Sequence, residues 1–354
     1  MKARAAALKT IGERATRDGR RPVRGAPERE VGAMNTDGGW PVERLVRKEV
    51  SGGVATITLD SPRNRNALSV RLLGDLEDRL NWALADEGVR VIVLTGTGPV
   101  FCAGADLKEQ RSAPGGAHEA PVTASFPEIM SMIWESPKPV ICRLNGTARA
   151  GGLGLVAACD FAIAPDTASF AFTEVRLGVV PAMIAVTVLR RLDPRAAAEY
   201  LLTGEVFDAA RAQEIGLLTR AVPAEELDAT VARYADMLLR GGPEALAITK
   251  QLVRTVPALP VEEGMRRMAE LSAQRFTSAE GQEGIAAFMA KRLPSWVPQP
   301  EPSDSGEAAA ESGESTGKPG EAAGEPGAAG AVPAGTTGGG AAEAAGGGEP
   351  VRGA

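Results

Sequence analysis

The chain has 354 residues, a formal net charge of −6, three cysteines and one histidine. With one histidine and no Cys-x-x-Cys pair, the sequence lacks the ligands of a structural zinc ion, and disulfides are not expected. No run approaches the roughly twenty apolar residues that a membrane-spanning helix needs. We therefore predict no metal site and no membrane association.

Both ends of the chain differ in composition from the middle. Residues 1–41 are rich in Arg and broken by Gly and Pro, and residues 299–354 are mostly Gly, Ala, Glu, Pro, Ser and Thr. These segments contain too few large apolar side chains to offset the entropy cost of ordering the chain. We therefore predict two disordered tails. Acidic residues interrupt the basic N-terminal run and no aromatics accompany it. This favours a solvated tail over a nucleic-acid-binding arm or a targeting peptide, and hence a cytoplasmic location.

Strand and helix patterns alternate through the first part of the middle. Segments rich in β-branched and apolar residues predict strands at 54–60, 89–95, 139–144 and 161–164. Ser69 can cap a helix with apolar residues at helical spacing, and a second helix is predicted over 151–158. This alternation implies an α/β core with parallel strands. Beyond Asp193 the pattern becomes helical throughout, as far as Pro298.

Two glycine-rich segments, 96–106 and 148–154, each follow a predicted strand. Small residues let a ligand approach backbone amides, and the second segment opens a helix whose unpaired N–H groups favour negative charge. Glycine content alone does not separate an anion site from ordinary strand-to-helix turns. Neither segment has the full G-x-G-x-x-G order of a dinucleotide-binding loop.

Short motifs occur along the middle in a characteristic order: Asn66-Ala67-Leu68-Ser69, Phe101-Cys102-Ala103-Gly104-Ala105-Asp106, Asn145-Gly146, Gly151-Gly152, Ala158-Cys159-Asp160, Phe172-Thr173-Glu174 and Leu202-Thr203-Gly204. In this order they resemble the crotonase, or enoyl-CoA hydratase/isomerase, superfamily. The resemblance implies an α/β fold of the ClpP/crotonase-like type. Residues 42–192 would form a ββα spiral, and residues 193–298 a helical region of the same domain that builds a homotrimer or homohexamer.

The resemblance also implies a substrate, an acyl-CoA thioester, with no permanently bound cofactor. The thioester carbonyl would lie between the backbone amides of Ala105 and Gly151, which stabilise the enolate oxyanion. Coenzyme A would be bound by the following residues: Arg63, Arg65, Ala67, Ala103, Ala105, Asp106, Leu107, Lys108 and Gly151, with Phe276 and Lys291 from the C-terminal helices. For the arginines and Lys108, a solvated basic surface is the simpler alternative.

The family's two-glutamate hydratases place one Glu three residues after the oxyanion glycine and a second about twenty residues further on. Here these positions are Gly154 and Glu174. The apolar neighbours of Glu174 are expected to raise its pKa and suit it to proton exchange near neutral pH. We therefore predict Glu174 as the catalytic acid–base. If the protein is a hydratase scaffold that lacks one carboxylate, Gly154→Glu should raise water addition, whereas no gain together with an efficient 3-enoyl shift in the parent would favour an isomerase.

Three functions remain open from the sequence. Segments 150–155 and 172–182 resemble enoyl-CoA and methylglutaconyl-CoA hydratases, so reversible addition of water to a 2-enoyl-CoA through a thioester enolate is favoured. A Δ3,Δ2-enoyl-CoA isomerase needs only one carboxylate to shuttle a proton and is the alternative. A non-catalytic acyl-CoA-binding scaffold is the third. A Ser-His-Asp hydrolase is disfavoured, because His118 lies in a Gly- and Pro-flanked loop.

Overall fold

The computed structural model describes residues 44–112 and 122–298. The predictions for the tails 1–41 and 299–354, and for the loop that holds His118, lie outside the described residues. Within them, no helix is both long enough and apolar enough to cross a membrane.

The strands, in chain order, are β1 (Val46–Ser51), β2 (Val54–Leu59), β3 (Val91–Gly96), β4 (Val100–Cys102), β5 (Val140–Arg143), β6 (Thr147–Arg149), β7 (Phe161–Pro165), β8 (Ser169–Ala171), β9 (Phe207–Asp208) and β10 (Arg220–Val222). The α-helices are α1 (Val70–Ala85), α2 (Leu107–Ser112), α3 (Val122–Glu135), α4 (Gly151–Ala158), α5 (Ala182–Val188), α6 (Pro194–Thr203), α7 (Ala209–Glu214), α8 (Leu227–Leu239), α9 (Pro243–Thr255), α10 (Val261–Thr277) and α11 (Ala279–Met289). The 3-10 helices are η1 (Pro62–Asn64), η2 (Glu174–Leu177), η3 (Ala224–Glu226) and η4 (Val256–Ala258).

From β3 to β8, successive strands alternate between two sheets. One sheet has six strands in the order β1-β2-β3-β5-β7-β10, and the other has four in the order β4-β6-β8-β9. Apart from the antiparallel pairs β1–β2 and β8–β9, neighbouring strands in both sheets are parallel. Each strand pair β3–β4, β5–β6 and β7–β8 therefore contributes one strand to each sheet before the chain turns into a helix. The carboxyl ends of β4, β6 and β8 consequently lie along one edge of the smaller sheet.

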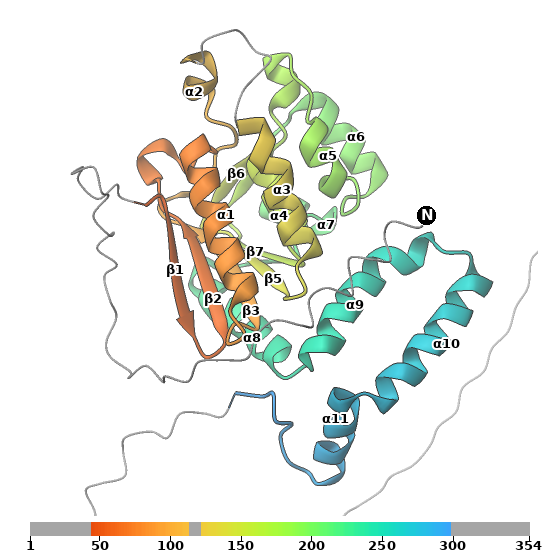
Figure 1. The fold of residues 1–354 in the computed structure, drawn as a ribbon. Helices are drawn as coiled ribbons and strands as arrows, with labels where there is room; N and C mark the ends of the chain where they lie inside the picture. The colour runs from red at the N-terminus through yellow and green to blue at the C-terminus, as the bar shows by residue number, and fades with distance from the viewer. Residues whose placement is uncertain (1–43, 113–121, 299–354) are drawn as a thin grey trace, which may run out of the picture. The chain divides into compact units, whose positions relative to one another are not determined.

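Helices cover both faces of the larger sheet, which is why its central strand is buried along its whole length. Ile92 and Leu94 of β3 belong to the apolar core that α1, α3 and α4 complete, whereas Val91 and Val93 belong to a second core with α8. Figure 1 shows α1 lying across β1 and β2. Its first residue follows Ser69, whose Oγ accepts a hydrogen bond from Leu72 N at 3.2 Å, as the sequence predicts.

The predicted strands all appear with small shifts at their ends, and the helix over 151–158 is confirmed at both ends. The expectation that the chain is helical throughout beyond Asp193 is wrong. Strand β9 joins the smaller sheet, and β10 extends the larger one by pairing Arg220 with Ile163. Strands of two and three residues are too short to show a period-two pattern in the sequence. They form because they pair with a neighbouring strand of the sheet.

A buried charge cluster attaches α9 to the core. The carboxylate of Asp160, which follows α4, lies 2.7 Å from Lys250 Nζ and 2.7 Å from Arg254 Nη2. Lys250 also donates to the carbonyl oxygen of Ile133 near the end of α3, and Arg254 stacks on the ring of Trp134. The cluster therefore connects α9 to the carboxyl-terminal ends of both α3 and α4.

Candidate active site

The three predicted catalytic residues follow three neighbouring parallel strands. Ala105 comes three residues after the end of β4, Gly151 two after the end of β6, and Glu174 three after the end of β8. Because the carboxyl ends of adjacent parallel strands meet at one edge, the chain topology brings these residues to the same place, where α/β proteins commonly bind ligands.

The backbone of Ala105 is held by a bridge to Leu68. Leu68 N donates to Gly104 O at 2.8 Å, and Asp106 N donates to Leu68 O at 3.3 Å. A parallel bridge of this kind uses the polar groups on either side of Ala105, so the N–H of Ala105 itself faces away from Leu68. Among the described residues this N–H has no acceptor.

Gly151 is the first residue of α4, so its N–H has no partner within the helix. In the part of the chain that the structure covers, it has none outside the helix either. The two amide-bearing loops touch, since a β-carbon built on Gly104, which has φ of +86°, would lie 3.3 Å from Gly151 N. Two unpaired donors, one of them at a helix N-terminus, thus lie on adjoining loops and suit an anionic oxygen.

Glu174 opens η2, and its Oε2 atom is buried without a hydrogen-bond partner. The preceding Phe170 and Phe172 are fully buried. Burial raises the pKa of Glu174 above the usual value for a glutamate, and a hydrogen bond from its own backbone N–H partly offsets this. The pKa of Glu174 is thus shifted in the direction expected from the sequence, and a raised pKa is typical of carboxyl groups that exchange protons with a substrate.

Gly154, on the same face of α4 one turn after Gly151, is buried and closely packed. A β-carbon built on Gly154 would lie 2.5 Å from Ile184 Cγ2 on α5 and 3.0 Å from Met130 Sδ on α3. A side chain at position 154 would therefore have to displace Ile184, so this packing disfavours the expectation that Gly154→Glu alone adds a second carboxylate, which stays a prediction. No sequence pattern indicates this contact, since it depends on how α5 packs against α4.

The residues predicted to contact coenzyme A fall into two groups. The first occupies two segments joined by a hydrogen bond from Asn64 Nδ2 to Asp106 Oδ2 at 2.7 Å. Exposed members of this group are Arg63, Arg65, Leu107 and Lys108, while Ala103 and Asp106 are half-buried and Ala67 is buried. The second group comprises the exposed Phe276 at the end of α10 and the exposed Lys291 just after α11. Binding of coenzyme A by either group stays a prediction.

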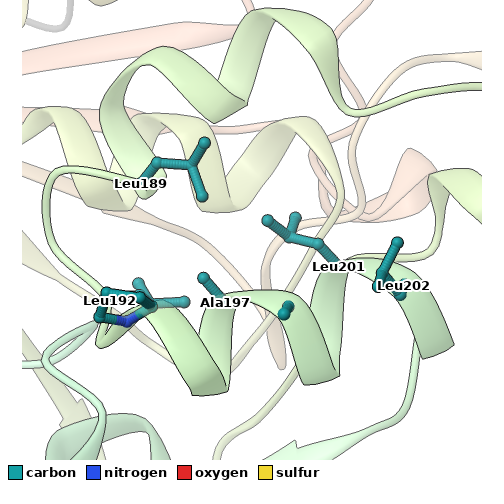
Figure 2. A pocket seen from close by; sticks show the side chains of 7 residues that line it. Leu189, Leu192, Ala197, Leu201 and Leu202 are labelled. Carbon is teal, nitrogen blue, oxygen red and sulfur yellow. The ribbon is translucent and has the colours of Figure 1, made fainter.

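An apolar hollow of about 480 Å³ lies between the end of α5 and α6 (Figure 2). Its lining consists of Leu189, Leu192, Pro194, Ala197, Ala198, Leu201 and Leu202. None of the three predicted catalytic residues lines this hollow, so it is separate from the candidate site.

A family model described as enoyl-CoA hydratase/isomerase matches residues 49–299. The chain belongs to this family. It is 33% identical over 265 residues to the mouse protein named enoyl-CoA hydratase domain-containing protein 3, mitochondrial, covering 75% of this chain and 88% of the mouse protein. The crystal structure of human enoyl coenzyme A hydratase domain-containing protein 3 is 32% identical, with a TM-score of 0.68 over 72% of this chain and 100% of the human chain. A Mycobacterium smegmatis enoyl-CoA hydratase structure is 33% identical, with a TM-score of 0.67 over 72% of this chain and 99% of that chain.

These matches confirm the crotonase superfamily and its mixed α/β fold with a helical C-terminal region. Membership of the enoyl-CoA hydratase/isomerase family identifies an enzyme of the hydratase/isomerase kind, whose substrates are CoA thioesters. The reaction itself depends on the groups at the site.

Proposed function

We propose that this enzyme adds water reversibly to the double bond of a 2-enoyl-CoA. The observation that carries the proposal is that two backbone amides, at Ala105 and Gly151, and the buried carboxyl oxygen of Glu174 follow three neighbouring strands at one sheet edge and have no hydrogen-bond partner among the described residues. The names of relatives, such as the Mycobacterium smegmatis enoyl-CoA hydratase, support the same reaction.

In this proposal a single carboxylate, that of Glu174, carries both proton transfers of the hydration. Glu174 takes a proton from water as the water oxygen bonds to C3, and the electrons of the double bond move onto the thioester oxygen. The amides of Ala105 and Gly151 stabilise this enolate, and each donor of such a pair contributes about 3 kcal/mol in comparable enzymes. Glu174 then returns the proton to C2, which regenerates the carboxylate. The raised pKa of Glu174 brings the two proton transfers closer in energy.

Δ3,Δ2-enoyl-CoA isomerisation is the second candidate, and the packing around Gly154 favours it. Ile184 and Met130 place apolar atoms against the position from which the side chain of a second carboxylate would extend. In isomerisation Glu174 removes a proton from C2 of a 3-enoyl-CoA and delivers it to C4, so no water has to enter. The same enolate forms, and the same two amides stabilise it.

A substrate panel separates these reactions. The purified protein is incubated with 2-enoyl-CoA and 3-enoyl-CoA thioesters of equal chain length, with saturated acyl-CoA as the control, and products are identified by chromatography and mass. Hydration adds one water to the 2-enoyl substrate, whereas isomerisation converts the 3-enoyl substrate to the 2-enoyl thioester without a change in mass. No product from either substrate would contradict both proposals and leave the non-catalytic acyl-CoA-binding scaffold.

The assembly and the location of the enzyme are proposed on the resemblance and the composition alone. We propose a homotrimer or homohexamer, and a cytoplasmic location. The mouse relative carries the word mitochondrial in its name. Fractionation of cells and light scattering on the purified protein test these two points.

A further inference from the structure

Residues 65 and 66 have an unusual backbone beside the candidate oxyanion site. Arg65 and Asn66 are consecutive non-glycine residues in the left-handed region, with φ of 52° and 50°. This conformation is unfavourable for Arg65 and is adopted more readily by Asn than by other residues with a β-carbon, and two such residues in a row persist only where surrounding interactions fix them. The chain therefore needs a group that holds these two residues in place.

The side chain of Asn66 supplies those interactions. It is completely buried, and its Oδ1 accepts from Ser61 N at 2.8 Å. Its Nδ2 donates to Thr97 O at 3.0 Å and to Val100 O at 2.8 Å. Asn66 thus joins the loop after β2 to the turn between β3 and β4, and all of these bonds are to backbone groups.

The segment that Asn66 fixes runs directly beside Ala105. Arg65 O accepts from Ala103 N at 3.1 Å, and the bridge between Leu68 and Ala105 follows. This register turns the N–H of Ala105 away from Leu68, and within residues 44–112 and 122–298 that N–H has no acceptor. A shift of the 65–68 segment would move the bridge and rotate that N–H.

We propose that Asn66 is a positioning residue for the oxyanion site: it holds the 65–68 segment in the register that aims the Ala105 amide at the thioester oxygen. The inference rests on the proposed function, since it assumes that the Ala105 amide binds this oxygen. It assigns Asn66 no contact with the substrate.

The direct test is Asn66→Gly, because glycine tolerates φ of 50° and the substitution removes only the side-chain hydrogen bonds. The expected result is a fall in kcat of about ten- to a hundredfold with little change in KM, as for a misplaced catalytic group. Thr219→Val is the matched control for lost stability, because Thr219 Oγ1 accepts a backbone hydrogen bond from Ala162 N, next to β10 and away from the site. That control is expected to keep its kcat.

Carbonyl polarisation is measured separately with a chromophoric cinnamoyl-type CoA thioester, whose absorption moves to longer wavelength when its carbonyl oxygen is hydrogen-bonded. We expect a clear shift on the wild type and a smaller one on Asn66→Gly. Asn64→Ala, at a partly exposed position, removes the bond to Asp106 on the other side of Ala105 and gives a second, milder variant. It is expected to reduce the shift in the same direction, which keeps the test decisive where Asn66→Gly does not fold.

Equal shifts in the wild type and both variants would overturn the positioning role of Asn66 while leaving the proposed function intact. Loss of kcat in Asn66→Gly with an undiminished shift would also overturn it. Absence of any shift on the wild type, with the thioester shown to be bound, would overturn the oxyanion assignment on which the inference rests.

Discussion

The contact between Gly154 and Ile184 makes a quantitative prediction about packing. A β-carbon at position 154 would lie 2.5 Å from Ile184 Cγ2, about 1 Å closer than the ordinary contact between carbon atoms. Overpacking of this kind costs about 1–3 kcal/mol, against a gain of about 1 kcal/mol in helix propensity when Ala replaces Gly. Gly154→Ala is therefore expected to be neutral or to destabilise by up to about 2 kcal/mol.

Gly74 on α1 is the matched control. A β-carbon there meets no atom within 4 Å, so Gly74→Ala shows the helix propensity alone and should stabilise the protein by up to about 1 kcal/mol. Ile184→Ala removes the Cγ2 atom and by itself costs about 2–5 kcal/mol. The double variant Gly154→Ala with Ile184→Ala should lose about 1–3 kcal/mol less free energy of unfolding than the two single variants lose together. Denaturant unfolding of the wild type, the two single variants at 154 and 184 and the double variant measures this coupling. Additive losses in the free energy of unfolding would show that Ile184 and position 154 are not in close contact.

The same pair controls whether a second carboxylate can be accommodated. Gly154→Glu alone should fold poorly or lose activity, because its side chain has no space and its charge is buried. Combined with Ile184→Ala, the new carboxylate has room, and hydration of a 2-enoyl-CoA should exceed that of Ile184→Ala alone. A gain in hydration by Gly154→Glu without the change at 184 would show that Ile184 does not block the position.

Two further predictions concern buried charge. Because burial raises the pKa of Glu174, the folded protein binds a proton there more tightly than the unfolded chain does. The stability that protonated Glu174 contributes is therefore present below the pKa of the unfolded chain and is lost as the pH rises through the pKa of the folded protein. Glu174→Gln removes this charge and should raise Tm more at pH 8 than at pH 4. A larger gain in Tm at pH 4 would contradict this prediction. Asp160→Asn leaves Lys250 and Arg254 without their shared carboxylate and should cost about 3–5 kcal/mol in urea unfolding, whereas a loss below about 1 kcal/mol would show that the cluster is not stabilising.

Local patterns in the sequence were sufficient for features that depend on neighbouring residues. The Ser69 cap, the bounds of α4 and the raised pKa of Glu174 all follow from short-range sequence signals. The motifs in order were specific enough to identify the family and its fold. The position of the site residues after β4, β6 and β8, at one edge of the smaller sheet, then follows from the repeating topology.

Features that depend on contacts between distant segments were not predictable in this way. Strand β10 is visible only through its pairing with β7, and the filling of the Gly154 position only through the packing of α5. The role of Asn66 likewise depends on three backbone partners, the farthest of them at Val100. In each case the residue is visible in the sequence, but the residues that it contacts are known only from the folded structure.

Turnover by Glu174→Gln tests the central claim most directly. The substitution keeps the shape of the side chain but removes its ability to take up and release a proton. We expect kcat on the preferred enoyl-CoA to fall by about a hundredfold or more, while CoA-thioester affinity stays within a fewfold of the wild type. Unchanged turnover in a folded Glu174→Gln enzyme would contradict the assignment of Glu174 as the acid–base of this site.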